Sequence, residues 1–107
     1  MALTVLITRD VEDRYRGFLA SVMLELAPGV YASPALSARA RDRIWAVLSD
    51  WHRQLGNGSL VLVYADRQAD GGLAVRHLGA PPRSVVRRDG VLLTTLRVFT
   101  EALMDDL

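Results

Sequence analysis

Apolar residues recur every three or four positions in two long stretches of the chain. The first stretch spans residues 11–26 and the second spans residues 36–55. This spacing places the apolar side chains of each stretch along one stripe of an α-helix. Pro28 must end the first helix, because proline disfavours helical backbone in the residue before it. Gly56 is a typical residue for ending the second.

Short polar residues indicate where the two helices begin. Asp10 is expected to cap the first helix, and Asp13 adds a second negative charge near its positive end. Ser33 is expected to cap the second, with Pro34 as its first helical residue. The pattern therefore predicts one helix from Asp10 to about residue 26 and another from Pro34 to residue 55.

Strand-like apolar stretches surround these helices. The predicted strands are residues 3–8, 30–33, 60–66, 73–78 and 91–96, with turns at 70–72 and 89–90. No strand is evident between residue 33 and the second helix. The best architecture is α+β: a ferredoxin-like sandwich of the βαββαβ type with shortened or permuted strand use, and both helices on one face of the sheet. We expect a ferredoxin-like domain over residues 1–96 and a tail over 97–107 that forms a short helix or a docking segment.

The predicted sheet has more apolar surface than two helices can cover. Residues 60–65 are apolar on both faces, and Leu6 lies on the second face of the first strand. A second copy of the chain, packed sheet against sheet, would cover the remaining face. The pattern therefore predicts a homodimer.

Composition narrows the class of protein. The chain has 107 residues, a formal net charge of +1 and no cysteine, which indicates one domain without disulfides or thiolate metal sites. No apolar run is long enough for a membrane span, and the N-terminus alternates like a strand rather than a signal peptide. We therefore expect a cytoplasmic protein with no membrane contact.

All 13 basic residues are arginine. Arginine binds phosphate with a planar, two-pronged group, but a genome rich in G and C also favours its codons. The positions that could contact an extended anion fall in three groups. They are Arg14 and Arg16 near a helix start, Arg39, Arg41 and Arg43 in the second helix, and Arg83, Arg87 and Arg88 in a loop and turn. For each group, an ordinary solvated surface is the alternative.

Three aspartates lie near predicted strand ends: Asp10, Asp66 and Asp70. A pair of them could hold a divalent metal, although capping and turn formation are alternative roles. His52 and His77 have no neighbours at ligand spacing. The sequence contains no glycine-rich phosphate loop and no nucleophile elbow. A self-contained active site is therefore not evident.

Several of these segments together resemble a known family. They are Arg14-Tyr-Arg-Gly, Leu24-Glu-Leu-Ala-Pro-Gly-Val-Tyr31, Ser37-Ala38-Arg39-Ala40-Arg41, Ile44-Trp45 and Asp89-Gly90. In this combination they resemble the CRISPR-associated adaptation protein Cas-two in its subtype I-E form. The resemblance covers about residues 3–96.

The resemblance implies a ferredoxin-like homodimer that bridges two dimers of the Cas-one integrase. The complex would hold double-stranded foreign DNA while the integrase inserts it into a CRISPR array. The implied phosphate contacts are Arg14, Arg16, Arg39, Arg41 and Arg83. The implied surface for the integrase lies in the last strand and tail, at Val91, Leu92, Leu93 and Leu96.

Two other functions stay open. Many members of the family are described as metal-dependent endonucleases of RNA or DNA, with an acidic residue at the end of the first strand. Here Arg9 and Asp10 stand there, so Asp10 of each subunit would be the catalytic candidate, with Mg²⁺ as cofactor only in that case. A third possibility is a ferredoxin-like regulatory dimer that binds a small molecule and has no affinity for DNA.

Overall fold

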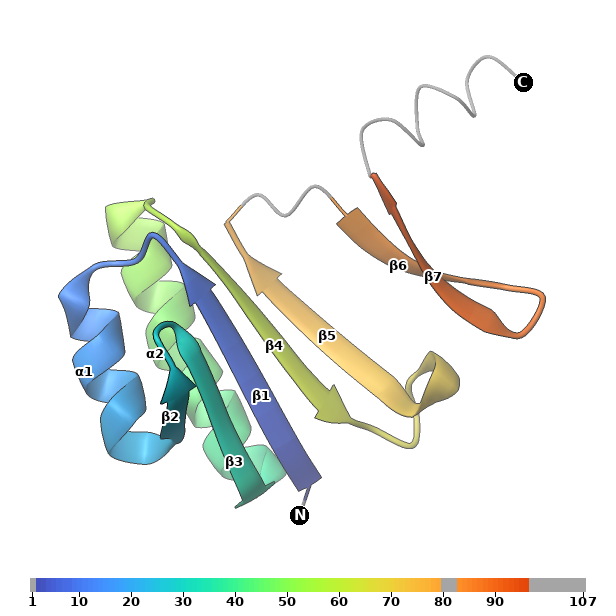
Figure 1. Ribbon diagram of the computed structural model, residues 1–107, viewed down its shortest axis with the longest axis horizontal. Helices are drawn as coiled ribbons and strands as arrows, with labels where there is room; N and C mark the ends of the chain where they lie inside the picture. The colour runs from blue at the N-terminus through green and yellow to red at the C-terminus, as the bar shows by residue number, and fades with distance from the viewer. Residues whose placement is uncertain (1, 80–82, 97–107) are drawn as a thin grey trace.

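The computed structural model describes residues 2–79 and 83–96 (Figure 1). The predicted tail at 97–107 and the Pro81-Pro82 segment lie outside this part of the chain. In chain order the elements are β1 (Ala2–Arg9), α1 (Asp13–Val22), β2 (Leu24–Ala27), β3 (Val30–Leu36), α2 (Ala38–Leu55), β4 (Ser59–Ala65), the short 3₁₀ turn η1 (Asp70–Gly72), β5 (Leu73–Leu78), β6 (Arg83–Arg88) and β7 (Val91–Leu96).

Five strands form one antiparallel sheet in the order β2-β3-β1-β4-β5. The elements from β1 to β4 follow the βαββαβ order of the ferredoxin-like plait, and β5 extends the sheet beyond β4. Figure 1 shows α1 and α2 on the same side of the sheet and the β6–β7 hairpin beyond β5. The predicted α+β ferredoxin-like class is confirmed.

The first helix is shorter than its apolar stripe predicts. It ends at Val22, Met23 has extended backbone, and β2 follows at once. β2 pairs with β3 across a tight turn in which Gly29 has a φ of +80°. The ladder of hydrogen bonds to β3 therefore overrides the helical pattern. The missing strand of the plait lies here, inside a segment that the sequence predicts to be helical.

Both predicted helix caps are wrong. Asp10 has left-handed backbone with a φ of +57°, and α1 begins three residues later. The second helix begins at Ala38, because Ser37 Oγ accepts the Ala40 N–H at 3.1 Å. Pro34 lies within β3, where the pairing with β1 shifts register. A proline is tolerated at such an irregularity because no regular ladder bond needs its N–H.

The strand β6 was not predicted. Its pairing with β7 is antiparallel, and Arg88 lies opposite Val91 across a two-residue turn. Asp89 and Gly90 both have positive φ, at 53° and 79°. This is the geometry that an Asp-Gly hairpin turn requires, so the turn itself was the signal for a strand on each side.

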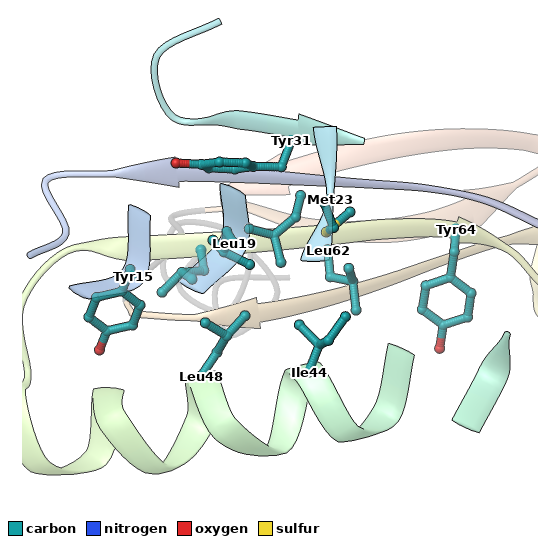
Figure 2. Packing of buried hydrophobic residues seen from close by; sticks show 10 residues of the cluster. Tyr15, Leu19, Met23, Tyr31, Ile44, Leu48, Leu62 and Tyr64 are labelled. Carbon is teal, nitrogen blue, oxygen red and sulfur yellow. The ribbon is translucent and has the colours of Figure 1, made fainter. Parts of the chain in front are cut away.

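The core fills the space between the helices and one face of the sheet. Ile44 and Leu48 point from α2 toward the sheet, where Leu62 lies (Figure 2). The largest fully buried side chains are Tyr15, Tyr31, Leu6, Leu19, Leu48, Leu60 and Thr4.

The opposite face of the sheet is apolar and open. Leu3, Ile7, Leu24 and Leu73 belong to this face by the strand register and are 57, 44, 60 and 40% exposed. They come from three different strands, so the apolar surface crosses the sheet. Within residues 2–79 and 83–96, no helix is long and apolar enough to cross a membrane.

Candidate nucleic-acid interface

Arg14 lies in the first turn of α1, where an aromatic cluster supports it. Its guanidinium carbon is 5.6 Å from the centre of the Trp51 ring, at cation–π distance. Trp51 in turn makes edge-to-face contacts with Tyr15 and Phe18, each at 5.4 Å. The side chain is exposed, and no carboxylate in the described part of the chain pairs with it. Its charge is therefore available to a ligand.

Arg16 differs from Arg14 because its charge is balanced within the fold. Arg16 Nε lies 3.3 Å from Glu25 Oε2 of β2, and the side chain is 61% exposed. The Tyr31 hydroxyl also hydrogen-bonds to Glu25, and this bond, with a smaller contribution from Arg16, lowers the pKa of the Glu25 carboxyl. Burial and the Glu25 carboxylate raise the pKa of Tyr31 to about 12. Arg16 therefore ties α1 to the β2–β3 hairpin as well as facing solvent.

Arg39 and Arg43 lie one turn apart on the exposed side of α2. Neither forms an ion pair with another residue that the structure describes. Trp51, which supports Arg14, comes twelve residues after Arg39 on the same helix. At 1.5 Å per residue, Arg39 and Trp51 are about 18 Å apart along α2.

Arg41 faces away from Arg39, because residues two apart on a helix are about 200° apart around its axis. Its guanidinium lies over the Tyr64 ring at 3.7 Å from the centre, and its side chain is only 14% exposed. Asp42 Oδ1 is 3.4 Å from Arg41 Nε and 2.9 Å from Arg76 Nη2 of β5. Sequence reasoning missed Arg76, because nothing in its local pattern signals a partner in α2.

The remaining predicted contact residues lie on the hairpin. Arg83 begins β6, and its side chain is outside the described part, as is that of Leu96. Val91 and Leu93 of β7 are 55 and 48% exposed. Leu92 instead packs on η1, where its Cδ1 would be 2.6 Å from a Cβ added at Gly71.

The three candidate aspartates are not brought together. Asp10 lines a pocket of about 250 Å³ with Asp13, Thr8 and Arg16, beyond the end of β1. Asp66 follows β4, which runs antiparallel to β1, so it lies at the opposite end of the sheet. Its Oδ1 accepts the Gln68 N–H at 2.9 Å, which is a turn-forming role. Among the residues that the structure describes, no group of three His, Cys, Asp or Glu could hold a metal ion.

Residues 3–93 match the model of the family described as CRISPR-associated protein (Cas_Cas2CT1978). The match includes both helices, all of the five-stranded sheet except Ala2, and most of the β6–β7 hairpin.

Proposed function

Because the chain belongs to this family of CRISPR-associated Cas-two proteins, we propose that it is a structural, DNA-binding subunit of a spacer-acquisition complex of subtype I-E. In this role it holds duplex DNA while a partner integrase performs the cutting and joining. The observation that carries the proposal is a pair of exposed, unbalanced arginines: Arg39 in the first turn of α2, and Arg14 of α1, which lies over Trp51 near the other end of α2.

The spacing of these charges suits an extended anion. Arg39 and Trp51, the ring under Arg14, are about 18 Å apart along α2, which corresponds to about five base pairs of duplex at 3.4 Å per step. A small anion would touch one of the two sites, whereas a phosphate backbone reaches both. Arg16, Arg41 and Arg83 complete the proposed set of contacts.

The proposal is tested by the salt dependence of DNA binding. Arg14→Gln and Arg39→Gln should each weaken binding to a duplex and reduce the slope of log K against log salt by about 0.9, because each removes one phosphate contact. Arg53→Gln is the matched control, because Arg53 is exposed on the same helix but already paired with Asp50. Slopes that match the control in both variants would refute this assignment.

We propose that the open face of the sheet is the interface of a homodimer. This face carries exposed Leu3, Ile7 and Leu24, which a second copy would remove from water. Ile7→Glu should shift the protein toward monomer in sedimentation, whereas Val22→Glu on the helix layer should not. A wild-type protein that sediments as a stable monomer at micromolar concentration would exclude this dimer.

We propose that β7 carries the docking surface for the Cas-one integrase. Val91 and Leu93 are exposed on the hairpin, and neither is needed for the core. A Val91→Ser, Leu93→Ser variant should lose co-purification with the integrase while keeping its affinity for DNA. Unchanged co-purification would place the docking surface elsewhere.

A metal-dependent endonuclease is the second candidate, and the pocket beyond β1 favours it. Asp10 and Asp13 both line this pocket, with the Thr8 hydroxyl beside them. Oxygen donors of this kind suit Mg²⁺, which is commonly held by one or two carboxylates and would supply an activated water. Asp10→Asn, assayed for both nuclease activity and spacer integration, separates the two functions. If the variant assembles with the integrase but no longer supports integration, the enzyme is favoured; retained integration favours the structural role.

A further inference from the structure

Two arginines from different elements share a single carboxylate oxygen. Asp42 Oδ1 lies 3.4 Å from Arg41 Nε and 2.9 Å from Arg76 Nη2. The same two guanidinium groups lie near the Tyr64 ring, at 3.7 and 5.3 Å from its centre. We call these four residues the Tyr64 cluster.

The Tyr64 cluster holds its arginines more firmly than its carboxylate. Arg41 is 14% exposed and stacked on the ring, and Arg76 extends from a paired strand. Asp42 is 56% exposed, so its carboxylate is largely in water. An ion pair with so exposed a partner contributes little to stability. Another anion of similar geometry can therefore replace the carboxylate while the arginines keep their positions.

A phosphate group has the geometry that the two arginines already accept. Guanidinium groups bind phosphate oxygens in the same way as carboxylate oxygens, through short charge-assisted hydrogen bonds. The site is also next to the proposed DNA surface, because Asp42 follows the exposed Arg39 by three residues on α2. Side chains three apart on a helix are neighbours.

We propose that Asp42 occupies the place of a nucleic-acid phosphate and competes with it for Arg41 and Arg76. This inference rests on the proposed DNA-binding function and adds Arg76 as a further phosphate contact. It also gives Arg41 a way to act in DNA binding despite its low exposure. The carboxylate sets the affinity: DNA must displace it to gain the contact.

The test compares two variants with the same change in charge, Asp42→Asn and Asp50→Asn. Asp50 is the matched control, because it also pairs with one arginine of α2, Arg53, away from the Tyr64 cluster. Asp42→Asn should bind a DNA duplex about fivefold more tightly than Asp50→Asn at low salt, the factor for one like-charge repulsion at about 4 Å in water. Its salt slope should also be steeper by about 0.9.

A second variant shows whether the effect passes through Arg76. When Arg76→Gln is added to both variants, the difference in DNA affinity between Asp42→Asn and Asp50→Asn should become smaller. Equal DNA affinities of Asp42→Asn and Asp50→Asn would overturn the proposal that Asp42 competes with phosphate. An undiminished difference in affinity in the Arg76→Gln background would overturn it as well. A fall in melting temperature with no tighter binding would show that the cluster only joins α2 to β5. Salt-dependent binding by the wild type alongside either result leaves the proposed function standing, whereas no binding by the wild type refutes both.

Discussion

Removing the same oxygen atom from two buried tyrosines should change stability in opposite directions. Tyr15 and Tyr31 are each 1% exposed, so both hydroxyl groups have left bulk water. The Tyr31 hydroxyl bonds to the Glu25 carboxylate. The Tyr15 hydroxyl has no hydrogen-bond partner among the residues that the structure describes.

The size of each change in stability follows from whether the hydroxyl group has a hydrogen-bond partner. A buried polar atom without a partner costs about 1–3 kcal/mol, so Tyr15→Phe should raise the free energy of unfolding by about 1 kcal/mol. The Phe ring would keep the edge-to-face contact with Trp51 at 5.4 Å. A hydrogen bond to a charged group contributes about 1.5–3 kcal/mol, so Tyr31→Phe should lower the free energy of unfolding by about 1–2 kcal/mol.

Urea unfolding of both variants at pH 7 measures the two changes directly. If the two-state slope is unchanged, the shift in midpoint gives the difference in stability. A Tyr15→Phe variant that is less stable than wild type by 1 kcal/mol or more would refute the reasoning, because the hydroxyl would then have an effective partner. Equal effects of the two substitutions would refute it as well.

Three further predictions concern pH and glycine. The pKa of Tyr31 is about 12 in the folded chain and 10.0 for an ordinary tyrosine, so the folded state holds this proton more tightly. The contribution of this proton to the free energy of unfolding is therefore complete below pH 10, and it falls by about 1.4 kcal/mol per pH unit as the pH rises from 10 toward 12. Urea unfolding at several pH values should show this slope, and Tyr31→Phe should reduce it. Gly17→Ala should raise the free energy of unfolding by about 1 kcal/mol in the same assay, because a Cβ there meets nothing within 4 Å and alanine favours a helix. Gly58→Ala should lower it by about 2 kcal/mol or more, since Gly58 has a φ of +77° and a Cβ would lie 2.6 Å from the backbone oxygens of Arg9 and Asp10; a neutral result would mean that the turn shifts freely.

The fold class could be predicted from the sequence because the apolar residues of most elements fit only one kind of secondary structure. α2 has one clear helical stripe and β4 is a short apolar run, while β5 is a short, mainly apolar stretch that also carries Arg76 and His77; turn residues bound both strands. Residues 24–27 fit two periods at once, because Leu24 and Leu26 alternate as in a strand and Leu26 also continues the helical stripe. Only pairing with β3 decides between them, and that pairing is a tertiary contact.

The candidate site was predictable in part. The arginines themselves were identified, and helical geometry alone separates Arg39 from Arg41. Two contacts could not be predicted, because they join different elements of the folded chain. Arg14 of α1 lies over Trp51 of α2, and Arg41 of α2 lies over Tyr64 of β4. Arg76 became relevant only through its contact with Asp42, which lies far away in the sequence.

Among residues 2–79 and 83–96, the hairpin of β6 and β7 forms a sheet of its own, in which each strand has one partner. Its backbone hydrogen bonds can therefore open without disturbing the five-stranded sheet, so its amide protons should exchange with solvent long before those of β1. No described strand pairs with the outer edge of either hairpin strand, so these edges offer N–H and C=O groups to an incoming strand. A partner protein could add a strand there and gain main-chain hydrogen bonds while the ferredoxin-like core stays intact.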